Sequence, residues 1–518
     1  MSEGQQLSSP PHATGLTRFL DRVERVGNRL PHPVWLFAIL AGVVALLSAV
    51  LSAAGLSVID PQDGTETPVR SVLSADGIRT LLLGAEESYT GFGPLGIVLV
   101  IMLGIAVANQ SGLFEAVVRR GLAGVRPRYV VFATCIAGSL ASLLSMSAYL
   151  VVVPLAAAAF QAVGRSPMLG MIVAFLSINA AADASPLIAP GDVVLSRIAT
   201  DAVQIVDPDM VVRPTDNMLF TTVSAIVLAI TLTVVVETVL AKREHELVPD
   251  PGAEGPLNGG TGSSVPDAVE RRALRITGAV ALGFVLLVAL TMVPTSSPLR
   301  GENGEVLDSA LIQSIAVVLF FFTFTLGVTY ARLTGRLDSW SDLPPQMAEG
   351  VRSVAPLLVL FFAVSQFLAV FSYTNISTAL AVSGADLLRQ LNAPVLAVLL
   401  ALIACLAVMN LVITSGTAMW ALVAPAIIPM TYLIGANPAT VLAAYRIADS
   451  CTNSITPMSP TFMLTVGFLQ MYRRRAGIGT LVSFTLPAAL VMLVVWTVLF
   501  IGWYALGLPL GPGSPVHP

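Results

Sequence analysis

The sequence predicts an all-α polytopic membrane protein, with about nine transmembrane helices plus two re-entrant helical hairpins arranged as inverted-topology repeats. Hydrophobic residues make up 55% of the 518-residue chain and charged residues only 11%, against about 25% charged residues in a soluble domain. Many apolar runs, such as 34–54 and 481–506, reach the roughly 20 residues that span the hydrocarbon of a bilayer. A long internal repeat is the third observation.

The repeat consists of two segments that lie 271 residues apart. "SAYLVVVPLAAAAFQAVGRSP" corresponds to "AMWALVAPAIIPMTYLIGANP", and each copy continues into a polar segment with prolines, "SINAAADASPLIAP" and "DSCTNSITPMSP". Because proline interrupts a helix, each copy should contain a broken helix. Paired broken helices are typical of transporters, in which helix ends near the bilayer midplane hold a substrate and an ion. The matching positions are Pro154, Gly164, Pro167 and Pro186 in the first copy and Pro425, Gly435, Pro438 and Pro457 in the second, with Tyr149 opposite Trp420.

The distribution of charge predicts which side of the membrane each loop occupies. Four arginines precede the first apolar run, which places the N-terminus in the cytoplasm by the positive-inside rule. A Gly/Pro/Ser-rich stretch in the middle of the chain indicates a flexible linker. The predicted segments are a cytoplasmic N-terminal segment (1–33), a first membrane half (34–242) with repeat 1 (about 93–202), a cytoplasmic linker (243–270), a second membrane half (271–506) with repeat 2 (about 354–472), and a C-terminal tail (507–518).

The same distribution of charge predicts that the two repeats are inverted in the membrane. The first copy begins with a span running inward, "FGPLGIVLVIMLGIA", and the second with a span running outward, "VAPLLVLFFAVSQFLA". Each repeat region must make an odd number of crossings, yet it holds enough residues for three or more helical pieces. A re-entrant hairpin followed by one interrupted span satisfies both conditions. Seven plain spans, with one more in each repeat region, give the expected total.

Several functions lack support in the sequence. The three cysteines show no metal-ligand spacing, so they imply neither disulfides nor zinc. The four histidines lie outside the apolar runs, which argues against a histidine proton relay. No motif of the G-x-x-x-x-G-K type is present, so ATP is not the expected energy source. No cleavable signal peptide precedes the first span, which we expect to be an uncleaved anchor.

Arg446 and Asp449 are the ionisable pair in the second broken segment, and their i, i+3 spacing puts them on one helical face. A charge at the centre of a membrane helix costs roughly 2.5–3.5 kcal/mol, so it should face a cavity or a partner. Asp449 would then be a protonation or ion site and Arg446 an anchor for an anionic substrate. The alternative is an internal salt bridge that only holds the broken helix. We expect Arg446 to be buried against an acid or a carbonyl.

Asp183 and Asp192 are the acids of the first broken segment, where they flank two prolines. Asp192 is a candidate second acid at the centre, and Asp183 lies beside the break. Either one can instead cap the following helix, since aspartate beside proline and glycine is a common helix start. The two broken helices should approach each other with Pro186 and Pro457 at corresponding bends.

The run "ITSGTAMW" predicts a hairpin tip in the second copy. Ser415, Gly416 and Thr417 offer hydroxyls and bare backbone to a ligand or a sodium ion, and Trp420 offers a stacking surface for an aromatic ligand, or plain packing. Two amides, Asn179 and Asn453, can coordinate an ion or join the halves; a sodium ion would lie near Asn453 and Asp449. Asn410 would only cap the hairpin.

The motifs "AAYRIADSCTNSITPMSPTF", "SGTAMWALVAPAIIPM", "YTGFGPLGIVLVIMLGIAVANQSGLF" and "GLPLGPGSP" resemble the p-aminobenzoyl-glutamate transporter (AbgT) family, from about residue 18 to the C-terminus. The resemblance implies a dimeric bacterial inner-membrane transporter with nine spans and two hairpins, divided into a core and an outer scaffold. Members import p-aminobenzoyl-glutamate or export sulfonamides using the proton gradient. This sequence departs from the family pattern at one place. In the first broken helix the family has an "SGG"-type sequence, whereas this chain has Asn179, Ala180 and Ala181. Family positions with functional weight fall on Asp192, Thr417, Trp420, Pro438, Arg446 and Asp449.

The leading hypothesis is therefore a proton-driven secondary transporter of p-aminobenzoyl-glutamate or sulfonamide antimetabolites, without a cofactor and without nucleic acid as a partner. Arg446 would bind the carboxylate or sulfonyl group, and Trp420 would contact the aromatic ring. Asp449 and Asp192 would carry the coupling protons. The alternative is a sodium-coupled symporter of small dicarboxylate-type anions. An intramembrane enzyme lacks a catalytic constellation. A channel would need a polar-lined pore, whereas the polar residues gather in two central clusters.

Overall fold

The computed structural model describes residues 32–59, 65–122, 125–140, 147–251, 253, 267–301, 304–306 and 309–517. Its first membrane half contains α2 (Pro33–Ala53), β1 (Ser57–Ile59), β2 (Glu66–Pro68), α3 (Ala75–Thr90), α4 (Gly93–Gln110), α5 (Leu113–Leu122), η1 (Pro127–Tyr129), α6 (Val130–Leu140), α7 (Ser147–Ala162), α8 (Pro167–Ala180), α9 (Pro190–Val203), α10 (Met218–Val235), η3 (Val236–Leu240) and η4 (Ala241–Glu246). The second contains α11 (Asp267–Thr291), α12 (Ala310–Gln313), α13 (Ile315–Leu333), η5 (Trp340–Asp342), α14 (Leu343–Tyr373), α15 (Ile376–Gln390), α16 (Val395–Asn410), α17 (Gly416–Tyr432), α18 (Pro438–Asn453), α19 (Pro460–Tyr472) and α20 (Ile478–Ala505).

The all-α membrane fold is confirmed. Seven helices or continuous helix pairs among the described residues are long and apolar enough to cross a membrane, and each coincides with one of the seven predicted plain spans. The bent pair α15 and α16, which turns by 119°, brings the number to as many as eight. The total of nine crossings stays a prediction. The N-terminal segment up to residue 31 and residues 254–266 of the linker lie outside the described residues.

Two connections hold structure that the sequence analysis did not anticipate. The loop between the first two spans forms the antiparallel strands β1 and β2, with Val58 opposite Thr67, and then helix α3, capped by the Ser74 hydroxyl. Helix α15 fills the connection between α14 and α16. Its counterpart in the first copy is α5, so the repeat unit is one helix longer than predicted.

Both copies contain a helical pair followed by a broken helix. The pairs are α6 with α7 and α16 with α17; the broken helices are α8 with α9 and α18 with α19. Pro186 lies in the first break and Pro457 in the second, and a proline at the first turn restarts each helix. The connection at residues 141–146 lies outside the described residues, whereas residues 411–415 form the tip between α16 and α17.

The two broken helices meet, as predicted. The Cys451 Sγ atom lies 4.0 Å from the Ala180 carbonyl oxygen, and these two residues are 271 positions apart, which is the offset of the repeat. A residue that touches its own repeat counterpart lies beside the axis that relates the copies. The Asp183 N–H, just beyond Ala180, donates to the Ser450 hydroxyl over 3.1 Å. The corresponding ends of α8 and α18 therefore meet, as expected if a two-fold pseudo-axis relates the repeats.

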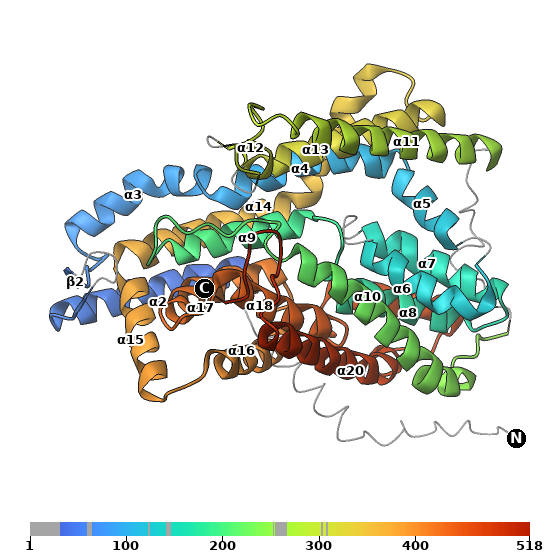
Figure 1. The fold of residues 1–518 in the computed structure, drawn as a ribbon. Helices are drawn as coiled ribbons and strands as arrows, with labels where there is room; N and C mark the ends of the chain where they lie inside the picture. Colours follow the sequence, from blue (N-terminus) through green and yellow to red (C-terminus); the bar gives the residue numbers. More distant parts are fainter. Residues whose placement is uncertain are drawn as a thin grey trace, which may run out of the picture.

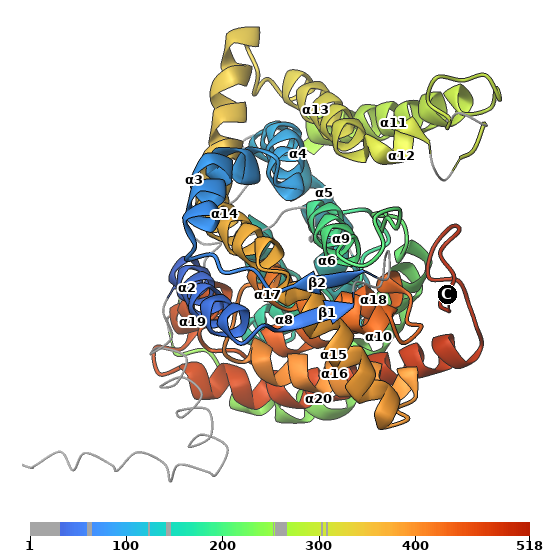
Figure 2. The same cartoon turned by 90° about the vertical axis from the view of Figure 1, so that its left-hand side faces the viewer.

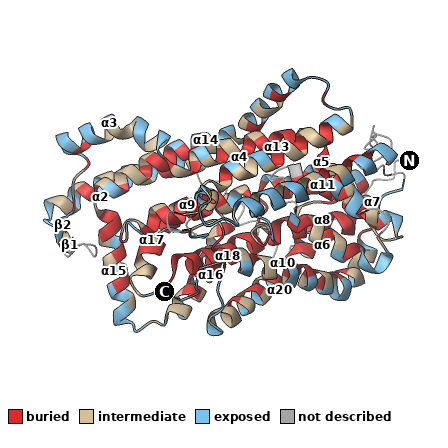
Figure 3. Ribbon diagram, turned by 45° about the horizontal axis from the view of Figure 1, so that its top comes forward, coloured by how far each residue is buried: buried red, intermediate tan, exposed pale blue. Residues whose placement is uncertain are grey.

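Burial divides the helices into an enclosed centre and an exposed periphery. Every residue of α8 is buried, and so is every residue of α18 from Pro438 to Thr452. Figure 3 shows this centre in red, with α3 and α11 largely exposed. Figures 1 and 2 show α3, α4, α11, α12 and α13 lying to one side of the bundle that contains α6, α8, α10, α16, α18 and α20. A polar side chain on α8 or α18 must therefore find its partners inside the protein.

Glycines bring the peripheral helices into close contact. A Cβ atom built on Gly327 of α13 would lie 2.6 Å from the Ala108 nitrogen of α4, and one on Gly350 of α14 would lie 2.5 Å from the Met102 oxygen. Real Cβ atoms do not approach backbone this closely, so the hydrogen side chain is required for α4 to pack against both neighbours.

We predict that Gly327→Ala destabilises the protein by about 1–3 kcal/mol, because α4 and α13 must separate around the added methyl group. Thermal unfolding in detergent should show a lower Tm. The matched control is Gly278→Ala on α11, where no atom lies within 4 Å of the added carbon. Equal Tm values for the two variants would contradict the close packing of α4 on α13.

Candidate functional site

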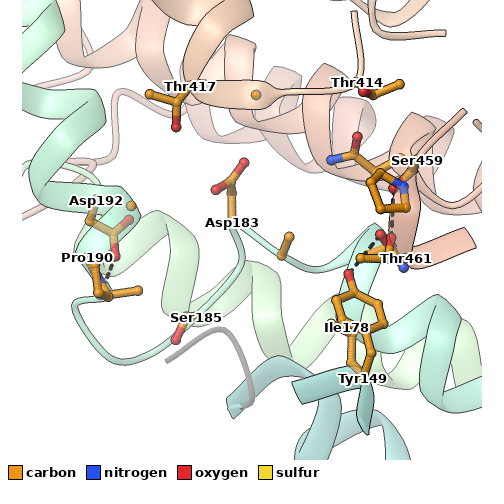
Figure 4. Close-up of a pocket in the computed structure, with 17 residues that line it drawn as sticks. Tyr149, Ile178, Asp183, Ser185, Pro190, Asp192, Thr414, Thr417, Ser459 and Thr461 are labelled. Atoms are coloured by element: carbon orange, nitrogen blue, oxygen red, sulfur yellow. Dashed lines mark hydrogen bonds between the residues drawn. The ribbon is translucent and has the colours of Figure 1, made fainter. Parts of the chain in front are cut away.

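A cavity of about 460 Å³ lies between the two broken helices and the second hairpin tip. Figure 4 shows Asp183 and Asp192 approaching it from the first repeat, and Thr414, Thr417, Ser459 and Thr461 from the second. Several wall residues come in pairs that are 271 positions apart: Ala182 with Asn453, Ala189 with Pro460, and Pro190 with Thr461. The cavity therefore lies where corresponding parts of the two repeats meet, as expected for the central site of a transporter.

Arg446 is the buried cation beside this cavity. Its residue exposure is 1%, and its Nη1 atom lies 2.5 Å from Asp192 Oδ1 and 4.0 Å from Asp183 Oδ1. The prediction that Arg446 is buried against an acid is confirmed. The partners come from the first repeat, however, and the alternative in which Arg446 pairs with Asp449 on its own helix is wrong. The ion pair therefore joins the two halves of the chain.

Asp192 caps the following helix, which is one of the two roles that the sequence analysis held open, and it also binds Arg446. Its Oδ2 atom accepts a hydrogen bond from the Ala189 N–H over 2.6 Å, which caps the N-terminus of α9. Its Oδ1 atom receives the Arg446 guanidinium. The cap fixes the carboxylate on the helix end, so the guanidinium meets an acid whose position is already set.

Asp449 is the other buried acid of α18, and it lies against the second hairpin tip. It belongs to the same cluster of charges as Asp183 and Arg446, and its Oδ1 atom is buried with no hydrogen-bond partner among the described residues. A Cβ atom on Gly416 would lie 2.6 Å from Asp449 Oδ2, so the glycine at the hairpin tip provides the space for this carboxyl group.

Ser450 binds Asp183 twice, and the sequence analysis did not select it. Its hydroxyl donates to Asp183 Oδ2 over 3.0 Å and accepts from the Asp183 N–H. The signal was present in the repeat, because Ser450 occupies the position that corresponds to Asn179. Asn179 lines the cavity and accepts a hydrogen bond of 2.9 Å from the Tyr149 hydroxyl.

The second hairpin tip contacts the break of α18 through Asn410. Its side-chain amide donates to the Asp449 carbonyl over 2.7 Å and to the side chains of Thr452 and Asn453 over 2.8 Å and 3.0 Å. The interpretation of Asn410 as a cap alone is therefore wrong. The amide binds the end of α16 to the end of α18, and Asn453 also lines the cavity.

The remaining predicted site residues divide into two groups. Gly416 and Thr417 line the cavity, whereas the Ser415 hydroxyl caps α17 by accepting from the Ala418 N–H. Trp420 and Pro438 do not line it. The Trp420 ring is fully buried 4.4 Å from the Tyr445 ring, and its indole N–H donates to the Leu195 oxygen of α9. Pro438 occupies the first turn of α18. In this conformation Trp420 is a packing residue, so we do not assign it the aromatic ring of a ligand.

The comparisons with known proteins agree along nearly the whole chain. The sequence profile of the AbgT putative transporter family matches residues 18–518. The protein belongs to the AbgT family. It is a membrane transporter and not an enzyme.

Individual members of the AbgT family are similar in sequence and in structure. The p-aminobenzoyl-glutamate transport protein of Escherichia coli (strain K12) is 33% identical over 510 residues, which is 98% of both chains. The Alcanivorax borkumensis YdaH transporter superposes with a TM-score of 0.87 at 35% identity, over 93% of this chain and all of its own. Neisseria gonorrhoeae MtrF, described with a class of antimetabolite efflux pumps, superposes with a TM-score of 0.88 at 35% identity, over 96% of this chain and all of its own.

We predict that Gly416→Ala lowers the transport rate at least about tenfold, because the added methyl group displaces the Asp449 carboxyl group from its place against the hairpin tip. Initial rates of substrate flux in proteoliposomes measure this effect. Gly467→Ala on α19 is the matched control, since it adds the same methyl group where no atom lies within 4 Å. Wild-type flux in Gly416→Ala would show that the position of Asp449 is unimportant.

Proposed function

We propose that the protein transports p-aminobenzoyl-glutamate and related aromatic anions, including sulfonamide antimetabolites, by proton-driven alternating access. The single observation that carries the proposal is the buried guanidinium of Arg446, bound to aspartates beside a cavity where the two repeats meet. The name of the Escherichia coli relative and the description of MtrF support the substrate class. No cofactor is part of the proposal.

The geometry suggests how the substrate and a proton would be coupled. Arg446 is already bound to Asp192, so a substrate carboxylate must replace this acid on the guanidinium. A proton on Asp192 removes its negative charge and frees Arg446 for the substrate. The anion and the proton then bind together, which favours co-transport. An exchange mechanism would require the two to compete, so the sign of the pH dependence distinguishes them.

Asp183 and Asp449 are candidates for a second proton position. Two carboxyl groups in one buried cluster repel each other when both are ionised, which favours a proton on one of them, and Asp183 lies 4.0 Å from Arg446. A cluster of three acids and one arginine would carry two negative charges if all groups were ionised. Adding protons to the acids therefore makes the cavity more favourable for an anion.

We predict that Asp192→Asn tightens substrate binding by about tenfold, because the amide no longer competes as a charge for Arg446. Equilibrium binding in detergent measures the affinity. Should the variant bind the substrate with the wild-type affinity, Asp192 is not the acid that the substrate replaces.

We predict that Asp449→Asn abolishes gradient-driven flux while folding and thermal stability remain close to the wild type. The amide has nearly the same shape as the acid and can donate to Asp183, so packing survives and only the titratable group is lost. Flux into proteoliposomes with an imposed proton gradient gives the readout. Wild-type flux with unchanged pH dependence would make Asp449 structural and leave Asp192 as the proton carrier.

Sodium is a second candidate for the coupling ion. Asn410 Oδ1 and Asp449 Oδ1 are both buried and lack hydrogen-bond partners among the described residues. Oxygen atoms of this kind suit a hard cation, and Asn453 lies beside them. Flux driven by an imposed sodium gradient at constant pH, and lost in Asn410→Ala, would establish sodium coupling in place of proton coupling.

We also propose a homodimer in a bacterial inner membrane with the N-terminus in the cytoplasm. Only 11% of the apolar window of α11 is buried within one chain, so this helix needs a lipid or protein neighbour. The start of the linker that is predicted to be cytoplasmic lies beside basic residues of other loops: Arg165 pairs with Glu237 and Glu244, and Arg473 donates to the Glu246 backbone oxygen. Their common location agrees with the positive-inside rule.

A further inference from the structure

A second cavity, of about 480 Å³, lies further along α9, next to α12 and α13. Its volume is in the range of about 300–1,000 Å³ that small-ligand sites occupy. Helix α9 contributes Val193, Ser196, Arg197 and Thr200 to its wall, while Asp192 of the same helix lines the central cavity. Five residues along an α-helix correspond to about 7.5 Å, so Arg197 lies about that far along the axis from Asp192.

The two cavities have opposite electrostatic character. The central cavity wall contains Asp183 and Asp192 and no basic residue among the described residues that form it. The second wall contains Arg197 and Arg213 and, among its own described residues, no acid. An anion can reach the arginines of the second wall directly, whereas at the central cavity it must first displace Asp192 from Arg446.

The structure holds both arginines at this wall. The Arg197 side chain lies across Gly93 at the start of α4, where any Cβ atom would overlap it. Its Nε atom pairs with Asp201 over 3.1 Å, and 44% of the side chain remains exposed. Arg213 is carried by the loop after α9, and the Thr200 hydroxyl holds this loop by accepting from the Val212 N–H over 2.9 Å.

The rest of the wall suits the apolar part of an aromatic anion. Ile97, Val193, Ile312 and Ile315 supply aliphatic surface, and the Gln313 amide adds a polar group. An arginine binds a carboxylate through two parallel hydrogen bonds, which gives orientation as well as charge. A molecule with an aromatic ring and a carboxylate would find a partner for each part.

We propose that this cavity is a staging site, in which Arg197 captures the carboxylate of the aromatic anion before it passes to Arg446 or after it leaves. The inference rests on the proposed function and adds a second anion-binding position on the same helix. It separates capture, which depends on the basic cavity, from coupling, which depends on the acids around Arg446.

The test compares KM and Vmax for radiolabelled p-aminobenzoyl-glutamate in proteoliposomes. Arg197→Gln should raise KM roughly 5- to 10-fold, as expected for the loss of a charged hydrogen bond, with Vmax within about twofold of the wild type. Asp201→Asn should leave KM unchanged or lower it, since it removes the carboxylate that competes for Arg197. A purely structural ion pair would make both variants change KM in the same direction, which would overturn the proposal.

A pair of glycine variants tests the position of the guanidinium without removing it. Gly93→Ala should raise KM, because the added methyl group moves the Arg197 side chain from its place. Gly96→Ala on the same helix is the control, since no atom lies within 4 Å of its added carbon, and it should keep the wild-type KM. Equal KM values for these two variants would also overturn the staging site.

Two further outcomes are distinguishable. If the wild type carries neither p-aminobenzoyl-glutamate nor a sulfonamide under any imposed gradient, the proposed function itself fails. If the wild type carries the substrate and Arg197→Gln has the wild-type KM, only the staging site fails. The kinetics are repeated in liposomes with and without anionic lipid. An Arg197 effect that occurs only with anionic lipid would assign the cavity to a lipid headgroup and overturn the proposal.

Discussion

The buried charge of Arg446 is the constraint on which the rest of the central structure depends. A guanidinium at 1% exposure loses its hydration, and this cost is large unless acids and hydrogen bonds surround the group. Both ion-pair partners within 4.0 Å belong to the break of the other repeat. Neither half can therefore hold its charges alone, and docking of α18 against the ends of α8 and α9 is a condition for a stable core.

Helix α9 connects the Arg446 ion pair to the hairpin and to the following loop. Its first turn presents Asp192 to Arg446, its second offers the Leu195 carbonyl to Trp420 of the hairpin, and its third binds the following loop through Thr200. A displacement of the ion pair would thus also displace the hairpin and the loop. This gives α9 the contacts needed to link charge changes at the centre to movements of the second hairpin.

The sequence was sufficient for the features that depend on local pattern. Apolar length defines the seven plain spans, and the spacing of prolines and glycines defines the two broken helices, because each is a property of consecutive residues. The local sequence pattern could not identify the acid that binds Arg446. Helical spacing points to Asp449, three residues away, whereas the acid that binds Arg446 lies 254 residues earlier. Only the docking of one repeat on the other selects it.

Asn410 was misjudged for the same reason, and sequence alone could not choose between the two roles held open for Trp420. Trp420 lies near the hairpin tip, but the side of α17 that faces the cavity depends on how the hairpin packs on Tyr445 and α9. The sequence analysis interpreted Asn410 as a local cap because its partners, at the end of α18, are distant in sequence. Ser450 is different. Its correspondence with Asn179 was visible in the repeat, and a comparison of the two copies position by position would have selected it.

The repeat is symmetric in its backbone and asymmetric in its chemistry. The counterparts of Arg446, Asp449 and Asp192 are Phe175, Ile178 and Met463, so no charge of the cluster occurs twice. Alternating access requires the two copies to exchange conformations around a fixed site. A site where corresponding residues of the two copies meet, as Ala180 and Cys451 do, can stay in place during this exchange. One set of charges at this meeting point can therefore serve both faces of the membrane, and a duplicate in each repeat would add only buried charge that needs its own partners.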